Sequence, residues 1–296
     1  MKDKKLNPVV SVGIPVHNGE KTIEKAIESI LNQTFTNFEI IISNNSSADL
    51  TVEICEKFQQ KDFRIKIYHQ KNYVDWIKNY NFVLDKAKGK YFVWLSADDF
   101  WEDTFLEKNI EVLNSNENIV GSTSDVKLFG KINKNLKKMV LNENGIQEKY
   151  QYVIPIKGSY EEKVEKFLKF GWVVNMYSVF RTEMLQKSMI KERPFAVADF
   201  TIILSILKFG DLEVIDEFLS HRSTEGWTST ESFIELLKKE DVGMFGIIFP
   251  YAKFTIWCLR NLGLKIFLKN LGWFIEVNNR SERKVLRELF NNIRKR

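Results

Sequence analysis

Two adjacent carboxylates, Asp98 and Asp99, follow the short apolar segment at 91–95 after Ser96 and Ala97. An apolar run of this length predicts a buried strand, and buried strands of α/β proteins open their binding sites at their carboxyl ends. Two acids side by side repel each other and favour a divalent cation that also binds phosphate oxygens. The alternative is that one of the two caps a helix beginning near Trp101, which is the commoner use of an isolated acidic pair. The rest of the N-terminal half favours the cation site.

The net charge of +5 is unevenly distributed along the 296 residues. Residues 243–296 hold eleven Lys and Arg against three Glu, a local charge of +8, so residues 1–242 carry about −3 of the total. A positive tail on a mildly acidic body suggests an anionic partner for the tail alone, and we expect no nucleic-acid partner. Cys55 and Cys258 lie far apart in apolar helical patterns and are predicted to be core thiols. The charged start lacks a signal-peptide pattern, which predicts a cytoplasmic protein.

The first 130 residues alternate strand and helix patterns, which predicts right-handed crossovers and a mostly parallel sheet. The predicted strands are 9–16, 38–43, 64–68, 90–97 and 119–129, and the predicted helices are 22–33, 52–58, 76–87 and 105–113. Helices over 160–169 and 199–208 and a strand over 212–219 follow. Because no G-x-G-x-x-G and no P-loop follows the first strand, a dinucleotide-binding Rossmann domain loses its main support.

Small polar residues follow three of these predicted strands. The three segments are His17-Asn18-Gly19-Glu20, Asn44-Asn45-Ser46-Ser47 and Ser96-Ala97-Asp98-Asp99. Since the carboxyl ends of parallel strands meet at one edge of the sheet, we expect these segments to lie together where a nucleotide binds.

With these segments the sequence resembles the family 2 glycosyltransferases, inverting enzymes with the GT-A fold. The matching elements are Ile14-Pro15-Val16-His17-Asn18-Gly19-Glu20, the Ser/Asn/Asp loop after the second strand, Lys88-Gly89-Lys90-Tyr91-Phe92, and Asp98-Asp99. The likeness covers roughly residues 8–229, and the motifs are specific in combination. It implies an α/β fold with a mostly parallel central sheet flanked by helices. The implied divisions are a Rossmann-like nucleotide-sugar-binding half at 1–130, an acceptor-side half at 131–230, and a basic, aromatic-rich helical extension at 231–296.

The resemblance also implies roles for the matched residues. The nucleotide-binding set would be Pro15, His17, Asn18, Glu20, Asn44, Ser46, Asp98 and Arg222. Asp98 matches the last acid of the family's Asp-x-Asp element, which binds Mg²⁺ or Mn²⁺ on the donor diphosphate, and Asp99 is a second candidate ligand. Ser96 replaces the first acid of that element, so one carboxylate is missing. Asn44 replaces a base-binding aspartate, and because an amide both donates and accepts, a uracil-type N–H is no longer specifically required.

An inverting transfer needs a carboxylate that takes the proton from the acceptor hydroxyl. The family places this acid at the start of a helix after the acceptor-binding region, and Asp199 is the matching residue. The alternative is that Asp199 only caps the helix or lies in its first turn. Arg222 lies after the next predicted strand in a segment similar to the family's Tyr-Arg-x-His; it would contact the diphosphate, or be an ordinary surface arginine.

The C-terminal extension mixes aromatic and aliphatic residues with cations, and no charge-free stretch reaches the about 18–20 residues that span a bilayer. This mixture suits a helix lying in a membrane interface, and the equal alternative is packing on the catalytic domain or in a dimer. We therefore expect a metal-assisted transferase that uses a nucleotide-sugar donor and a glycan or lipid-linked acceptor, in surface polysaccharide or glycolipid synthesis. Peripheral contact with the inner membrane face is a further expectation. The alternatives are a nucleotidyltransferase of related fold and a catalytically degenerate binding module.

Overall fold

The structure is a computed structural model that describes residues 7–130, 153–170, 173–189, 197–225, 233–239 and 243–294. The strands are β1 (Val10–Val16), β2 (Phe38–Asn44), β3 (Ile65–His69), β4 (Tyr91–Trp94), β5 (Phe100–Trp101), β6 (Ile119–Phe129), β7 (Val179–Arg181) and β8 (Asp211–Ser223). The helices up to residue 206 are α1 (Ile23–Leu31), α2 (Thr51–Lys61), α3 (Trp76–Asp85), α4 (Phe105–Ser115), α6 (Tyr160–Phe170), the 3₁₀-helix η1 (Val173–Tyr177), α7 (Thr182–Ser188) and α8 (Ala198–Ile206). The C-terminal helices are α9 (Phe233–Lys239), α10 (Gly243–Ile248), α11 (Ala252–Asn261), α12 (Leu264–Lys269) and α13 (Leu271–Arg294).

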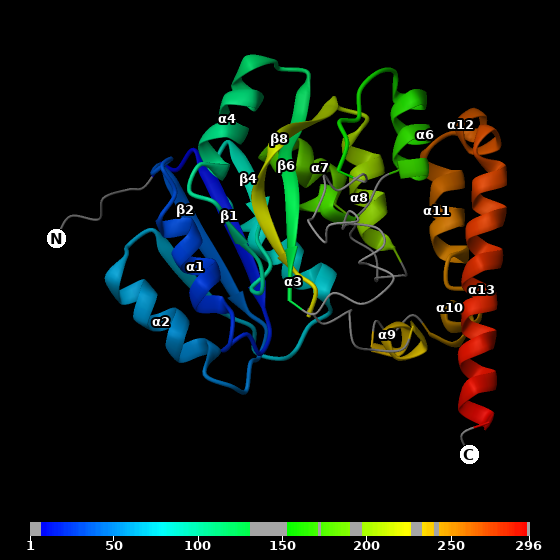
Figure 1. Ribbon diagram of the computed structural model, residues 1–296, viewed down its shortest axis with the longest axis horizontal. Coiled ribbons are helices and arrows are strands. Elements are labelled where there is room, and N and C mark those ends of the chain that lie inside the picture. Colours follow the sequence, from blue (N-terminus) through cyan, green and yellow to red (C-terminus); the bar gives the residue numbers. More distant parts are fainter. Residues whose placement is uncertain are drawn as a thin grey trace, which may run out of the picture.

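The strands of the described residues form one sheet in the order β3-β2-β1-β4-β7-β6-β8-β5, in which most neighbours are parallel. Two short strands run the other way: β7 lies antiparallel between β4 and β6, and β5 pairs antiparallel with β8. The prediction of a mostly parallel sheet flanked by helices is confirmed, and Figure 1 shows helices packed on the sheet from both sides. Neither short strand was predicted, because two or three residues are too few to show an alternating pattern.

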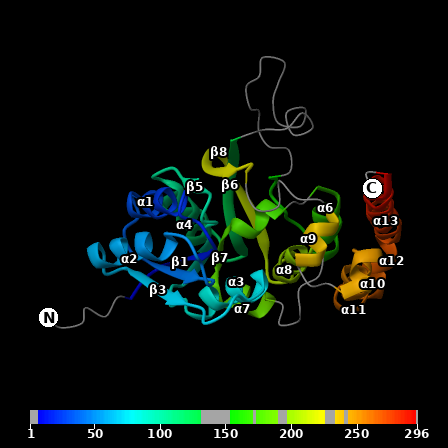
Figure 2. The same cartoon turned by 90° about the horizontal axis from the view of Figure 1, so that it is seen from below.

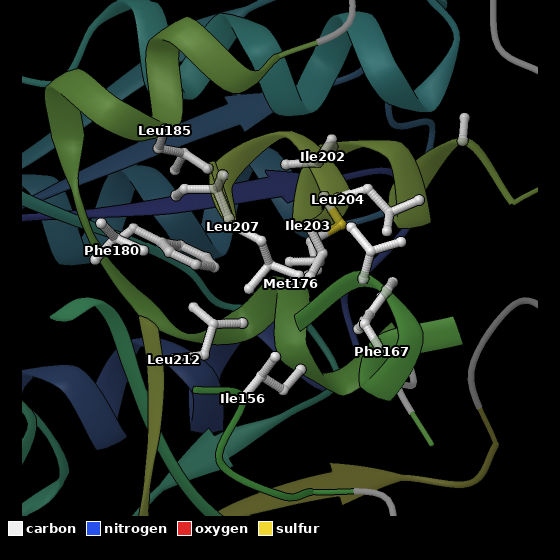
Figure 3. Packing of buried hydrophobic residues seen from close by; sticks show 14 of the residues in the cluster. Ile156, Phe167, Met176, Phe180, Leu185, Ile202, Ile203, Leu204, Leu207 and Leu212 are labelled. Carbon is white, nitrogen blue, oxygen red and sulfur yellow. The ribbon is translucent and has the colours of Figure 1, made fainter. Parts of the chain in front are cut away.

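Side chains of β4 alternate between two hydrophobic cores, one on each face of the sheet, as the pleat requires. Tyr91 and Val93 pack with α1, α2 and α4 on one face, and Phe92 and Trp94 pack with α3, α7 and α8 on the other. Figure 3 shows part of the second core, where Phe167 of α6 and Ile202 of α8 lie among the labelled side chains. Both predicted core thiols, Cys55 and Cys258, are buried and free.

The C-terminal helices join the second core. Phe254 and Cys258 of α11 are fully buried, as is Phe274 of α13, in the same cluster as the side chains of α8. On the surface, Lys265 of α12 pairs with Glu161 of α6 at 2.8 Å. One side of the extension therefore packs on the catalytic domain, as one of the two alternatives expected. Figures 1 and 2 show α11, α12 and α13 together at the end of the molecule remote from α2.

Candidate active site at the carboxyl edge of the sheet

The three predicted site segments follow strands that end at the same edge. Val16 at the end of β1 pairs in register with Asn44 at the end of β2, and Gly13 pairs with Trp94 at the end of β4. The backbone N–H of Asn45 also donates to the carbonyl of Val16 at 2.8 Å. The residues after these strands are thereby brought together, as expected from the direction of parallel strands.

Hydrogen bonds tie the loop after β1 to the loop after β2. His17 Nδ1 lies 2.7 Å from the carbonyl oxygen of Asn45. The Asn18 side chain accepts from the Ala48 N–H at 2.9 Å, and the Glu20 carboxylate accepts from the Leu50 N–H at 3.1 Å. The backbone N–H groups of Asn18 and Glu20 donate in return to the side chains of Ser47 and Asp49. These predicted nucleotide-binding side chains thus hold two loops in one fixed arrangement.

The predicted base-binding residues of β1 and β2 are largely enclosed. Pro15 is buried in β1 opposite Ser43. The Asn44 side-chain oxygen accepts from the Ser47 N–H at 3.1 Å, which closes a turn, and the Ser46 hydroxyl donates to a backbone carbonyl at 3.1 Å. A nucleotide base would therefore meet a turn whose shape is set by its own hydrogen bonds.

Left-handed backbone conformations coincide with the predicted site. In the described part of the chain, the non-glycine residues with positive φ are Asn18 (53°), Ser46 (56°) and Val197 (58°). Asn18 and Ser46 lie in two of the three polar segments, and Val197 lies two residues before Asp199. Such conformations cost free energy and are concentrated at functional sites, so their placement supports the loops after β1 and β2 and the start of α8.

Asp99 is held at both carboxyl oxygens. Its Oδ1 accepts from the Ser223 N–H at 2.9 Å, and its Oδ2 lies 3.2 Å from Arg222 Nε. Burial raises the pKa of Asp99 to about 6, although the Arg222 guanidinium favours the ionised form. Neither acid caps a helix, because α4 begins only at Phe105 with Thr104 as its N-cap. The helix-cap alternative is therefore wrong.

Arg222 lies inside β8, which extends four residues beyond the predicted end at 219. Its guanidinium carbon is 4.0 Å from the centroid of the Tyr177 ring, within the range of a cation–π contact. The Tyr177 hydroxyl accepts from Ser96 at 3.1 Å and lies 3.1 Å from the Tyr80 hydroxyl. Ser96, which replaces a family acid, thus supports the ring on which Arg222 rests. Sequence reasoning missed Tyr80 and Tyr177, because no motif distinguishes them from other core aromatics.

Next to Arg222, His221 is buried against the loop before α4. Its Nε2 lies 2.6 Å from Glu102, and its ring stacks on Phe100 with centroids 4.3 Å apart. Burial lowers the pKa of His221, and the Glu102 carboxylate opposes that shift. These contacts fasten β5 to β8 directly beside the Asp99–Arg222 pair.

Asp98 differs from Asp99 in its partners. The ion pairs of the described residues include Arg222 with Asp99 but none to Asp98, which is partly exposed. Burial raises the pKa of Asp98, and the nearby Arg222 opposes the rise. A free, partly buried carboxylate of this kind fits a divalent cation as a single protein ligand. In the described residues no group of three or more His, Cys, Asp or Glu could hold a metal ion unaided. The residues therefore fit a cation that is also bound by phosphate oxygens, rather than a metal held by protein alone.

Asp199 lies in the first turn of α8. The N-cap position belongs to Val197, so Asp199 is not the capping residue. Burial raises the pKa of Asp199 to about 6, although hydrogen bonds from the backbone N–H groups of Phe200 and of Asp199 itself favour the ionised form and lower it. A carboxylate with this pKa is ionised at pH 7 and is a stronger proton acceptor than an exposed aspartate. The first-turn alternative and the base role are compatible with this position.

No helix of the described residues combines the length and the apolar character that crossing a membrane requires. Trp227 lies outside the described residues, and Trp94 is fully buried.

Sequence comparisons identify relatives of this chain. The family profile described as "Glycosyl transferase family 2" matches residues 11–188. An uncharacterized glycosyltransferase of Haemophilus influenzae is 37% identical over 122 residues, which cover 41% of this chain and 38% of that protein. The putative glycosyltransferase EpsH of Bacillus subtilis is 27% identical over 278 residues, covering 93% of this chain and 71% of that protein.

Solved structures of similar fold include two complexes with sugar nucleotides. Residues 1–349 of Staphylococcus aureus TarS with UDP-GlcNAc give a TM-score of 0.57 at 18% identity, over 91% of this chain and 81% of that chain. The mannosyltransferase PcManGT of Pyrobaculum calidifontis with GDP-Man and Mn²⁺ gives 0.58 at 13% identity, over 96% and 74%. At these identities the likeness concerns the fold. The family profile, however, covers more than half of the chain, and the chain belongs to glycosyl transferase family 2.

Proposed function

We propose that this protein is an inverting glycosyltransferase that moves a sugar from a nucleotide-sugar donor to an acceptor hydroxyl. The observation that carries the proposal is the carboxyl edge of the sheet, where Asp98 keeps an unpaired carboxylate while Arg222 holds its neighbour Asp99. Family membership favours this activity over the nucleotidyltransferase alternative.

The donor nucleotide binds against the two cross-linked loops after β1 and β2. Pro15, His17, Asn18 and Glu20 come from the first loop and the strand before it, and Asn44 and Ser46 from the second. Since the hydrogen bonds between these loops already fix their shape, little ordering is needed when the base and ribose bind. The related structures contain a uridine and a guanosine diphosphate sugar, so both classes are candidates here.

The donor diphosphate lies at the end of β4. Asp98 is the residue that would hold Mg²⁺ or Mn²⁺, with the diphosphate supplying further oxygen ligands. When bound, such a cation neutralises charge that develops on the departing diphosphate. We assign Asp99 a different task from the metal ligation first expected, because both of its oxygens are engaged. Arg222 is fixed by Asp99 and Tyr177 and adds positive charge to the same edge.

Asp199 accepts the proton of the acceptor hydroxyl. As that oxygen forms its bond to the anomeric carbon, the bond from this carbon to the diphosphate oxygen breaks, and the configuration of the sugar inverts. The proton stays on the Asp199 carboxyl group and the electron pair leaves with the nucleoside diphosphate. A pKa of about 6 leaves Asp199 ionised at neutral pH and able to take this proton.

The acceptor is a glycan or lipid-linked saccharide of a surface polysaccharide or glycolipid, and the C-terminal helices contact an anionic membrane face. The support for the membrane contact is the outer side of α11, α12 and α13, which exposes large apolar side chains. They are Ile256, Leu259, Leu264, Leu268, Leu271, Ile275, Leu286, Leu289 and Phe290. Such side chains insert at the boundary between headgroups and acyl chains while neighbouring cations attract anionic lipids.

A thermal-shift screen of UDP-, GDP-, dTDP- and CMP-sugars with Mn²⁺ tests the proposal. We expect one donor class to raise the melting temperature of the protein, and Asp98→Asn to abolish that metal-dependent rise. Asp103→Asn is the matched control, since Asp103 is an exposed acid between β5 and α4 and its replacement should leave the rise unchanged. Absence of any donor response, or an undiminished response in Asp98→Asn, would contradict the proposal.

A further inference from the structure

The C-terminal helices form a solvent-open cavity of about 670 Å³ that the proposed reaction does not use. Four cations of α13 line it: Arg280, Arg283, Lys284 and Arg287. The aromatic residues Phe233, at the start of α9, and Tyr251, just before α11, also line it. Cations and aromatic rings that line one open cavity suit a ligand that is anionic at one end and apolar at the other.

The four cations stand on one side of α13 because their spacing of three, four and seven residues follows the helical repeat. Arg280 pairs with Glu276, which also lines the cavity, at 2.5 Å. For Arg283, Lys284 and Arg287 the described residues offer no ion pair, and Lys284 Nζ lies 4.4 Å from the centroid of the Phe233 ring. Three cations therefore remain available, and guanidinium groups match phosphate oxygens in geometry as well as in charge.

The walls of the cavity are held in place by specific contacts. The Glu288 carboxylate of α13 accepts hydrogen bonds from the N–H groups of Phe233 at 3.2 Å and Ile234 at 3.0 Å. Ile234 also packs with Val285 of α13 in a small buried cluster of its own. Glu288 is thereby turned to the start of α9, and these contacts hold Phe233 beside the cations of α13.

An exposed apolar surface borders the cavity. The helix α10 contacts both α9 and α13 and exposes Met244, Phe245 and Ile248 to solvent, just before Tyr251. Figure 1 shows α9 at the end of the molecule where β8 finishes, and in Figure 2 it lies between α8 and the C-terminal helices. The exposed apolar surface of α10 therefore adjoins the cavity that α9, α13 and Tyr251 line.

We propose that this cavity binds the phosphate or diphosphate group of an amphiphilic acceptor whose apolar chain lies along α10. The inference rests on the proposed function, because it names the class of acceptor that the transferase uses. Arg283, Lys284 and Arg287 contact the anion, and the exposed side chains of α10 contact the chain.

Calorimetric titration of the full chain with farnesyl diphosphate in EDTA tests the inference without the donor or a metal. We expect binding that weakens at least tenfold in Arg283→Gln/Arg287→Gln, since each substitution removes a charge-assisted contact. The control Arg260→Gln/Lys265→Gln removes two exposed cations of the extension outside the cavity and should bind like the unmodified protein. Pyrophosphate, a free anion, and farnesol, a neutral chain, should both bind at least tenfold more weakly than farnesyl diphosphate.

Equal weakening in the two double variants would overturn the inference, because it would mean attraction by net charge alone. Equal binding of pyrophosphate and farnesyl diphosphate would overturn it as well, since the apolar chain would then contribute nothing. Asp98→Asn should leave farnesyl diphosphate binding intact, and loss of binding in that variant would place the diphosphate in the donor site instead. Donor binding by Arg283→Gln/Arg287→Gln is measured separately with Mn²⁺. This measurement tests the proposed function alone, so that failure of the proposed function can be distinguished from failure of this inference.

Discussion

The carboxyl edge of the sheet, where we propose that the donor binds (the donor edge), and the C-terminal helices of this protein are built by different interactions. At the donor edge, hydrogen bonds of His17, Asn18 and Glu20 tie one loop to the next, and Arg222 neutralises Asp99. In the C-terminal helices apolar packing dominates: α11 and α13 pack on α8 through buried aromatic side chains. Their outer sides remain apolar and exposed.

This difference separates two requirements of a transferase. A polar donor with a diphosphate is bound best by groups that are already oriented, because no conformational entropy is then lost in ordering them on binding. An amphiphilic acceptor and a membrane need accessible apolar area and cations, which the C-terminal helices provide. Asp199, to which the proposed function assigns the acceptor proton, belongs to α8.

The largest effect is expected for Asp199→Asn, which keeps the size of the side chain but cannot take a proton. Transfer should fall by about 10²–10⁴-fold, the usual range for loss of a general base. In the unmodified protein, the rate should rise with pH through about 6 as the Asp199 carboxyl group loses its proton, and this dependence should vanish in the variant. If the variant retains transfer within a few-fold, Asp199 is not the general base and has only a structural role in the first turn of α8.

The packing of the extension is tested by Phe254→Ala. Because Phe254 is fully buried between α8 and α13, its truncation should lower the free energy of unfolding by about 3–5 kcal/mol. Ile256→Ala on the exposed side of the same helix should change it by less than about 0.5 kcal/mol. Chemical denaturation measures both, and equal small effects would mean that α11 does not share the core. The same packing predicts that deletion of residues 243–296 makes the protein insoluble.

The fixed charge pair of the donor edge is tested by Arg222→Gln. Removing one partner leaves the Asp99 carboxylate, 5% exposed, without a counter-charge, which should cost about 3 kcal/mol of stability at pH 8. The loss should shrink below pH 6, because burial raises the pKa of Asp99 and the neutral acid no longer needs the cation. Adding Asp99→Asn should restore part of the stability at pH 8. A loss independent of pH and of Asp99 would show that Arg222 acts by packing alone.

A smaller effect is expected at the membrane. Ile275→Gln/Leu286→Gln removes two apolar side chains from one exposed face of α13 and should lower the affinity for anionic vesicles about tenfold. Leu50→Gln/Phe63→Gln makes the same kind of change at exposed positions near α2, on the donor side, and should leave vesicle binding unchanged. Cosedimentation measures vesicle binding of both variants. Equal losses would mean that the extension contributes no more to membrane binding than other exposed apolar residues do.

The sequence predicted the β1–β4 half and its three polar strand ends because both depend on local patterns and on the direction of parallel strands. The partner of Asp99 was not predictable in this way. Arg222 is 123 residues further along the chain, in a strand whose last four residues follow the polar rather than the apolar pattern. The Tyr177 ring beneath it comes from a five-residue 3₁₀-helix with no periodicity to detect. The composition of the extension predicted that it mixes apolar and basic residues. Which of its faces packs on the domain and which stays exposed depends on tertiary contacts, which the composition does not specify.

The central claim is that Asp98 serves the donor and Asp199 the acceptor. Its most direct test is the affinity for the donor found in the screen, measured with Mn²⁺ for Asp98→Asn and Asp199→Asn side by side. We expect Asp98→Asn to lose metal-dependent donor binding, whereas Asp199→Asn should bind the donor as the unmodified protein does. Undiminished donor binding in Asp98→Asn, or equal loss in both variants, would contradict it.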